Sequence, residues 1–537
     1  MDEITGESGG RTFCSVECAR VGRGCTTQHT GTLVGPAGDA TAAPDPSAGT
    51  VMAMADNTMT DAVLADTTSG KIRGERQRGA SVFRAIPYAS AERFGHPVAA
   101  TAWDDVRDCL QWGPMCPQTT TFLDDVFGTK HLTMSEDCLS LNIFTPGCDD
   151  QRRPVLVWIH GGAFTAGTAA TPWYSGNSFA RNGNVVVVSI NYRLNIFGFL
   201  HVDGATNLGL RDQVAALGWI RDNIETFGGD PANVTIFGES AGGCSVVTLL
   251  ATPSARGLFR RAIAQSPSVT QLRTPDTARS WAEQTLRSAG AASLAELAAL
   301  SVDRLVAVQQ EIQSSGADAG FQSFSPAPDG DVLPADVLGA IAGGSAAGTE
   351  LLIGTTRDEM RLFMFMDPSL NTLDHDGLVE RLTNRFGDRA AFVADRYRAS
   401  RPAASPAHLL AAVASDEIFR RPAVDVATRH CAHAPVYTYL FAWESPAFGG
   451  ALGSCHGLEI PFVFDNVHQK GVALFTGAGG DRAALAATMN AAWTRFARDG
   501  DPGWPAFDPA RRTTMTFNTP HCGVETDPDG ALLRLWP

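Results

Sequence analysis

The chain has 537 residues, of which 44% are hydrophobic and 18% are charged. This apolar fraction is enough for a large core and excludes a disordered chain. Its 42 lysines and arginines and 57 aspartates and glutamates give a formal net charge of -15, so we expect neither nucleic acid nor an anionic membrane surface to be a main partner.

Residues 1–60 differ in composition from the rest of the chain. They contain one aromatic residue, Phe13, and glycine, alanine, threonine, serine and proline crowd the stretch from 30 to 50. Such a segment buries too little apolar surface to offset its loss of conformational entropy. We therefore expect a disordered, low-complexity tail over residues 1–60. Methionines at 52, 54 and 59 also leave open a translation start assigned too far upstream.

The cysteines of the tail and the search for targeting signals bear on metal binding and on cellular location. Four potential zinc ligands lie in the tail, at Cys14, Cys18, Cys25 and His29. Their spacing matches no zinc module, so we expect no metal. No apolar run reaches the ~18–20 residues that span a bilayer, and no apolar signal stretch follows the acidic start of the chain. We expect a cytoplasmic protein without a cofactor or stable membrane insertion, although secretion stays open and the oligomeric state is undetermined.

The pattern beyond residue 61 alternates between apolar strands and amphipathic helices. Residues 154–160, 184–190 and 234–238 are short, β-branched and apolar almost throughout, as in strands of a parallel sheet covered on both faces. Between the last two, residues 207–227 carry apolar side chains every three to four positions, which predicts a crossover helix.

The C-terminal half continues the same alternation. Further strands are predicted at 261–264, 350–353, 435–441 and 513–517, and the alanine- and leucine-rich stretch 275–347 predicts helices inserted between strands. No repeat or linker interrupts the pattern. We therefore expect one large α/β domain over residues 61–537, with a mostly parallel sheet flanked by helices.

A G-x-S-x-G motif is centred on Ser240. It follows a predicted strand and precedes a predicted helix, which is the strand–turn–helix setting of a nucleophile elbow. The same pattern surrounds Ser8, but no strand or helix is predicted there. Ser240 is therefore the candidate nucleophile, with helix N-terminal amides directly behind it.

The predicted strand 154–160 runs into a second small-residue motif, HGGAF at residues 160–164. Acyl transfer needs backbone N–H donors aimed at the oxyanion of the tetrahedral intermediate. Small residues let a substrate approach that backbone closely. We expect the donors to be the amides of Gly162, Ala163 and Ala241.

Several longer segments carry a family resemblance. The chain resembles the type-B carboxylesterase/lipase family, which includes bacterial para-nitrobenzyl esterases, carboxylesterases and cholinesterases on the α/β-hydrolase fold. The resemblance runs from about residue 61 to the C-terminus. It rests on residues 135–146, 160–164, 191–200, 207–212 and 227–243.

The family order is serine, acid, histidine, and the resemblance implies the last two. Asp358 and Glu359 follow the predicted strand 350–353, and the residues alone do not choose between them; the family has glutamate at the second position, which implies Glu359. His456 stands in a glycine-rich loop before an apolar run. It would take the proton from Ser240 and return it to the leaving alcohol. Three more positions resemble residues that line or brace the family's site: Gly161, Glu239 and Ser245.

The resemblance carries further expectations. Cys116 and Cys138 match the ends of a disulfide loop of secreted relatives, but two buried thiols are equally expected. Two pairs of this chain, Arg93 with Glu136 and Arg193 with Asp212, resemble structural ion pairs of the family. The loop between the two cysteines has no tryptophan, which disfavours choline esters.

These features predict a serine carboxylic ester hydrolase that forms an acyl-enzyme and accepts a broad range of small to medium esters as its small-molecule substrates. Three alternatives stay open. The same machinery could act on carbamates or aryl amides, it could serve a lipase, or the chain could be a non-catalytic binding member. The run Gly161-Gly162-Ala163 further resembles family members that accept esters of tertiary alcohols.

Overall fold

The computed structural model describes residues 61–120, 128–129, 131–314, 324–469, 471–479 and 481–536. The predicted tail, with Ser8 and its potential zinc ligands, lies outside the described residues. Its disorder therefore stays a prediction.

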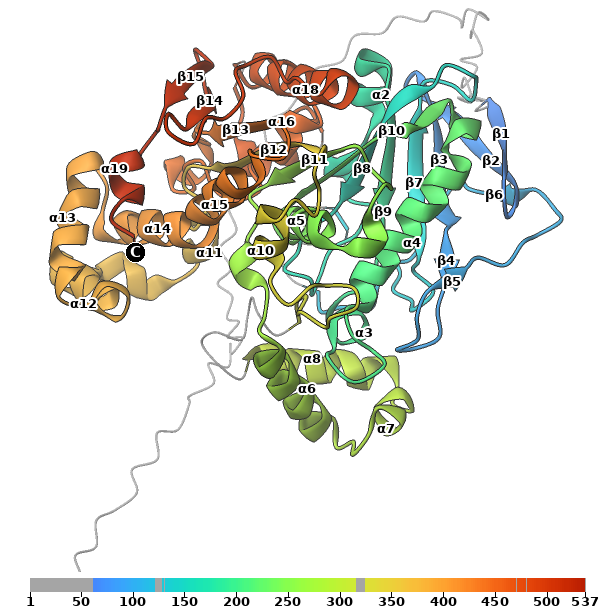
Figure 1. The fold of residues 1–537 in the computed structure, drawn as a ribbon, viewed down its shortest axis with the longest axis horizontal. Helices are drawn as coiled ribbons and strands as arrows, with labels where there is room; N and C mark the ends of the chain where they lie inside the picture. Colours follow the sequence, from blue (N-terminus) through green and yellow to red (C-terminus); the bar gives the residue numbers. More distant parts are fainter. Residues whose placement is uncertain are drawn as a thin grey trace, which may run out of the picture. The chain divides into compact units, whose positions relative to one another are not determined.

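A twisted 13-stranded sheet runs through the described residues (Figure 1). Its centre, from β9 to β14, is parallel throughout, and the flanking pairs are antiparallel, apart from the short parallel pair of β2 with β6. In spatial order the strands are β1 (Ala62–Thr67), β2 (Gly70–Gln77), β3 (Ala80–Pro87), β7 (Ser140–Thr145), β9 (Val186–Ile190), β8 (Arg153–Ile159), β10 (Gly229–Glu239), β11 (Arg261–Gln265), β12 (Glu350–Thr356), β13 (Val436–Phe441), β14 (Thr513–Phe517) and β15 (Gly523–Thr526), with β6 (Arg107–Asp108) beside β2 and a separate pair of β4 (Ala89–Ser90) and β5 (Val98–Ala99).

All seven strands predicted from the sequence are present, and most of their ends lie within a residue or two of the prediction. Every residue of β9 is buried, as expected for a valine-rich strand covered on both faces. β10 is longer than predicted, because it begins at Gly229 and passes an irregularity in register before Val234. The strands β1 to β3 and β7 were not predicted. β2 explains why: its sequence, GKIRGERQ, alternates polar exposed residues with few buried ones.

Helices cover both faces of the sheet (Figure 1). The predicted crossover helix is confirmed as α4 (Leu208–Asn223), continued by the 3-10 turn η2 (Ile224–Phe227). The inserted helices predicted over 275–347 are α6 (Pro275–Ala289), α7 (Leu294–Ala298), α8 (Val302–Ser314) and α10 (Val337–Ala342). The others are α2 (Asn177–Gly183), α3 (Asn195–Phe199), α5 (Ala241–Ala251), α11 (Arg361–Met364), α12 (His375–Phe386), α13 (Ala390–Ser400), α14 (Pro406–Ser415), α15 (Arg421–His430), α16 (Ile460–Val463), α17 (Val472–Thr476), α18 (Asp481–Asp499) and α19 (Gly530–Leu533), and a π-helix, η7 (Asp416–Arg420), joins α14 to α15.

The alternation of side chains along β8 builds two cores. Val157 and its neighbours on the same face pack in one cluster with α4 and α5. Trp158, on the other face, packs with α2, α16 and α18. A third, smaller cluster joins α12, α13 and α14 to Leu370 and to the C-terminal residues Leu532 and Leu535. Because the central strands are parallel, their carboxyl ends meet at one edge of the sheet, where loops carry functional residues in such folds.

Candidate active site

Ser240 occupies the sharp turn between β10 and α5. Its backbone has φ 57° and ψ -120°, a conformation that costs an L-residue on the order of 1–3 kcal/mol. Two backbone hydrogen bonds hold it: the Ser240 amide donates to Gln265 O at 3.0 Å, and the Cys244 amide donates to Ser240 O at 2.8 Å. The side chain of Ser240 does not cap the helix, so no capping hydrogen bond occupies its hydroxyl group.

The glycines around Ser240 serve close packing of backbone on backbone. A Cβ atom added at Gly242 would lie 2.0 Å from Ile159 O, and one added at Gly238 would lie 2.6 Å from the carbonyl carbon of Gly242. The start of α5 therefore rests directly on the end of β8. The glycines of the G-x-S-x-G motif are therefore needed for the contact between β8 and α5 as well as for the turn at Ser240.

Gly162 and Ala163, two of the three residues predicted to supply oxyanion donors, lie in the loop after β8, and the third, Ala241, begins α5. Gly162 has φ 112° and Ala163 has φ 53°. Among the described residues, the amides of Gly162, Ala163 and Ala241 donate no hydrogen bond, so all three are free to bind a developing negative charge. Gly161 adjoins Ser240, because a Cβ atom added to it would lie 3.1 Å from Ser240 Cβ.

The carbonyl groups of the same loop are turned into the loop itself. Gly162 O accepts hydrogen bonds from the amides of Thr165 and Ala166, both at 3.0 Å. Gly161 O accepts one from His160 Nδ1 at 2.8 Å. Burial lowers the pKa of His160 to about 4, so this imidazole stays neutral. Engaged carbonyls are held away from a substrate beside the loop.

Glu359 and His456 meet although 97 residues separate them. Glu359 Oε2 accepts a hydrogen bond from His456 Nδ1 at 2.6 Å. Its other oxygen, Oε1, accepts from Ser266 Oγ at 2.6 Å and from the Thr356 amide at 2.8 Å. Glu359 is fully buried. This carboxylate holds the imidazole in the tautomer that leaves Nε2 free to accept a proton.

Asp358, the neighbouring carboxylate, points to different partners. It accepts hydrogen bonds from Arg357 Nη2 at 2.8 Å and from the Ser454 amide at 3.1 Å. Burial opposes its ionisation, but the cations Arg357 and Arg361 outweigh burial and hold the pKa of Asp358 below its usual range. Asp358 therefore braces the loop that carries His456, and His456 itself contacts Glu359.

Two further buried carboxylates surround the imidazole. His456 Nε2 lies 3.0 Å from Glu239 Oε1, but at an angle that gives no hydrogen bond, so neither atom has a hydrogen-bond partner. Glu459 receives one hydrogen bond, from Gln265 Nε2 at 3.1 Å. No hydrogen bond joins Ser240 to His456 within the described residues, and such bonds often tighten only with substrate bound.

The pKa values follow from this crowding. Burial raises the pKa of Glu239 to about 7 against the opposing effect of His456. Burial, with Glu239 and Glu359 nearby, raises the pKa of Glu459 to about 8. For His456, burial alone would lower the pKa, but Glu239 and Glu359 outweigh burial and raise it to about 9. The basicity of the imidazole is thus set by the charge of its neighbours.

Four residues at the site were not predicted. Ser266 follows β11 directly, and the rule that ligands meet the carboxyl ends of parallel strands could have indicated it. Glu459 is a lone carboxylate at the start of a buried apolar run, which is itself a signal. Phe363 and Phe419 contact the His456 ring, with centroids 5.1 and 4.7 Å away, and nothing in the sequence marks them.

The remaining predicted residues have structural positions. Ser245 lies on α5 and accepts a hydrogen bond from Gln213 of α4 at 3.1 Å, so it braces two helices. Arg193 Nη2 lies 2.7 Å from Asp212 Oδ1 in a buried ion pair. The second expected pair, Arg93 with Glu136, is half-buried, with 2.9 Å from Nε to Oε2.

Cys116 and Cys138 are buried free thiols in this structure. Their mutual hydrogen bond, together with burial, raises the pKa of Cys138 well above its usual value. The described part of the chain contains no group of three or more histidine, cysteine or acidic side chains that could hold a metal ion. It also contains no helix long and apolar enough to cross a membrane.

Comparison with known proteins agrees with this geometry. A model of the carboxylesterase family matches residues 61–536. The chain is 38% identical over 486 residues to a para-nitrobenzyl esterase of Bacillus subtilis (strain 168), covering 87% of this chain and 96% of that protein. It is 36% identical over 469 residues to a phenmedipham hydrolase of Pseudarthrobacter oxydans, covering 83% and 94%.

Solved structures give the same answer for the fold. The crystal structure of a Geobacillus stearothermophilus carboxylesterase at pH 6.2 matches with a TM-score of 0.79 and 38% identity, over 88% of this chain and 100% of that one. A thermophilic para-nitrobenzyl esterase matches with a TM-score of 0.79 and 37% identity, over 88% and 99%. The expected α/β-hydrolase fold is confirmed. The chain belongs to the carboxylesterase family and is a serine carboxylic ester hydrolase.

Proposed function

We propose that Ser240, His456 and Glu359 carry out this hydrolysis through an acyl-enzyme. Ser240 Oγ attacks the ester carbonyl carbon while His456 Nε2 takes the hydroxyl proton. The carbonyl oxygen becomes an oxyanion, which binds the amides of Gly162, Ala163 and Ala241. When the carbon–oxygen bond of the ester breaks, His456 gives its proton to the leaving alcohol. Water then attacks the acyl-enzyme by the same route and releases the acid.

One observation carries the assignment of roles. The buried 2.6 Å hydrogen bond between Glu359 and His456 Nδ1 leaves Nε2 as the proton acceptor, and Nε2 lies 3.0 Å from Glu239, the residue directly before Ser240. Glu359 accepts two further hydrogen bonds and so cannot rotate away. The free amides at both sides of Ser240 complete the chemistry that acyl transfer requires.

The substrate range that we propose is broad: small to medium carboxylic esters, bound as free small molecules. The support is family membership together with relatives whose names describe hydrolysis of para-nitrobenzyl esters and phenmedipham. Carbamates, aryl amides and triglycerides use the same machinery and are the alternatives to test. We further propose that residues 61–537 form the catalytic domain.

A substrate panel tests both points. Para-nitrophenyl esters of increasing acyl length are compared with one para-nitrophenyl carbamate and one anilide by kcat/KM. We expect the short and medium esters to be the better substrates. A carbamate or anilide turned over faster than every ester would overturn the proposed substrate class.

The nucleophile is tested by a matched pair of variants. Ser240→Ala removes the proposed nucleophile, and Ser8→Ala changes the serine of the second G-x-S-x-G motif. We expect Ser240→Ala to lose nearly all esterase activity and all labelling by an organophosphate, and Ser8→Ala to keep both. An active, labelled Ser240→Ala protein would contradict the assignment.

A further inference from the structure

A π-helix lies beside the proposed catalytic histidine. Residues Asp416–Arg420 (DEIFR) join α14 to α15, and such insertions of one extra residue per turn are frequent at functional sites. Here the π-helix carries Phe419, whose ring centroid lies 4.7 Å from that of His456 with a 40° angle between the ring planes. Phe419 is 2% exposed, so this contact is buried.

The start of the π-helix has a buried polar anchor. Asp416 is 2% exposed, and its Oδ2 accepts a hydrogen bond from the Tyr397 hydroxyl at 2.6 Å. That hydroxyl in turn accepts one from Trp536 Nε1 at 3.2 Å. A buried carboxylate without this donor would lose a large part of its stabilisation. The anchor therefore ties the π-helix to α13 and to the C-terminal segment.

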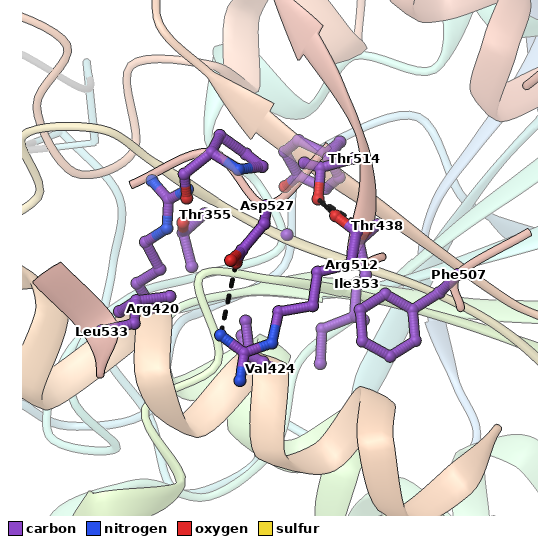
Figure 2. A pocket seen from close by; sticks show the side chains of 14 residues that line it. Ile353, Thr355, Arg420, Val424, Thr438, Phe507, Arg512, Thr514, Asp527 and Leu533 are labelled. Carbon is purple, nitrogen blue, oxygen red and sulfur yellow. Dashed lines mark hydrogen bonds and ion pairs between the residues drawn. The ribbon is translucent and has the colours of Figure 1, made fainter. Parts of the chain in front are cut away.

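The end of the π-helix has a second anchor. Arg420 donates a hydrogen bond to Pro528 O at 2.7 Å and lies 3.3 Å from Asp529 Oδ2. Arg420 is one of the residues that line a small pocket (Figure 2), whose volume of about 30 Å³ has room for roughly one or two water molecules. Apolar packing is thus incomplete at this end. Polar contacts with Pro528 and Asp529 hold Arg420 on this side.

The same segment reaches the loop that carries Glu359. Ser415, the last residue of α14, accepts a hydrogen bond from the Met360 amide at 3.0 Å. Ile418 O accepts one from Thr270 Oγ1 at 3.5 Å. The segment therefore contacts the neighbour of Glu359 on one side and the ring of His456 on the other.

From these contacts we propose that the π-helix is a positioning device for proton transfer, and that Phe419 is its positioning residue. Phe419 limits the tilt of the His456 imidazole, while Asp416 and Arg420 fix the place of Phe419. This inference rests on the proposed role of His456. A displacement of a catalytic group by about 1 Å can cost ~100-fold in rate, so the loss of Phe419 should be felt in kcat.

The test distinguishes a positioning role of Phe419 from a role in lining the substrate pocket. We compare Phe419→Ala with the parent enzyme on para-nitrophenyl acetate, butyrate and hexanoate. A positioning role predicts that kcat falls by the same factor, about 10- to 100-fold, on all three esters, with KM little changed. A fall that depends on acyl length, or no fall, would overturn the proposal. Phe419→Tyr keeps the ring and should restore most of kcat.

Three more variants separate positioning from stability. Phe179→Leu changes another buried phenylalanine, which contacts Phe237 and Phe464 and not His456. It should lower the melting temperature and leave kcat unchanged, whereas Phe419→Leu should lower kcat. Tyr397→Phe removes only the hydroxyl that binds Asp416 and should lower kcat in the same uniform way.

The double variant tests whether the two residues act through one segment. If they do, Tyr397→Phe combined with Phe419→Ala should lose no more activity than Phe419→Ala alone. Fully multiplicative losses would refute a shared device. Failure of the triad itself is distinguished by His456→Asn: if that variant kept the parent activity, the proposed catalytic roles would fail, whatever Phe419 does.

Discussion

Substitution of Glu359 by glutamine has an outcome that the structure determines in detail. Glu359 Oε1 accepts two hydrogen bonds, from Ser266 Oγ and the Thr356 amide, and Oε2 accepts one from His456 Nδ1. A glutamine has one oxygen, which stays where the two donors are. Its NH₂ group then faces Nδ1. The imidazole must place its proton on Nε2, where it blocks acceptance of the Ser240 proton.

The expected loss is large because the wrong tautomer, and not a missing contact, causes it. The corresponding change in a serine protease triad lowers kcat by about 10⁴, which corresponds to about 5 kcal/mol of transition-state stabilisation. We expect a loss of this order in kcat for para-nitrophenyl acetate, with KM little changed, because Glu359 does not touch the substrate.

Asp358→Asn is the matched control. Asp358 binds Arg357 and the Ser454 amide and makes no contact with His456 in the described structure. Its replacement should lower the melting temperature, since a buried charge pair is weakened, and leave kcat within about tenfold of the parent. The reasoning fails if Glu359→Gln keeps more than about one per cent of kcat, or if Asp358→Asn loses more kcat than Glu359→Gln.

Four other expectations follow. Ser240→Gly should melt at a higher temperature than Ser240→Ala, because glycine adopts φ 57° without strain; equal melting temperatures would show that the turn stores no strain. Glu239→Gln should shift the rising limb of the pH profile of kcat/KM to lower pH, because neutral His456 is the active form. Burial lowers the pKa of His456, and Glu239 is the largest of the influences that raise this pKa to about 9. A limb that stays in place or moves to higher pH would contradict this. Tert-butyl acetate should be hydrolysed more slowly than n-butyl acetate but measurably, because the carbonyls of Gly161 and Gly162 are engaged within their own loop; no turnover in gas chromatography would refute it. A chain that starts at Met59 should keep its activity and melting temperature by calorimetry, and a drop of several degrees would show that the tail packs on the domain.

The sequence predicted the centre of the sheet well for a physical reason. Strands such as β9 are buried on both faces, so their valines and isoleucines form unbroken apolar runs. β2 pairs through its backbone while exposing most of its side chains, and a polar exposed strand leaves no such run. The hydrophobic pattern therefore predicts the central strands of the sheet and does not predict the edge strands.

The site divides in the same way. Ser240 and the oxyanion amides are local features, each marked by a turn next to a strand, so the residues alone indicated them. Glu359 and His456 are 97 residues apart, and their contact depends on the fold, which is why the resemblance was needed. Phe419 could not be predicted, because its role depends on a π-helix that no composition or spacing in the sequence marks.

The crowding around the nucleophile has a consequence for how such an enzyme evolves. A Cβ atom would lie 2.0 Å from a backbone oxygen at Gly162 and at Gly242, and 2.4 Å from one at Gly243. These positions have no tolerated substitutes, so mutation cannot explore new chemistry through them. Phe363 lies on α11, a short helix without buried residues, which can change without moving that backbone. Laboratory selection for new esters should therefore accumulate changes in α11 and leave the glycines untouched.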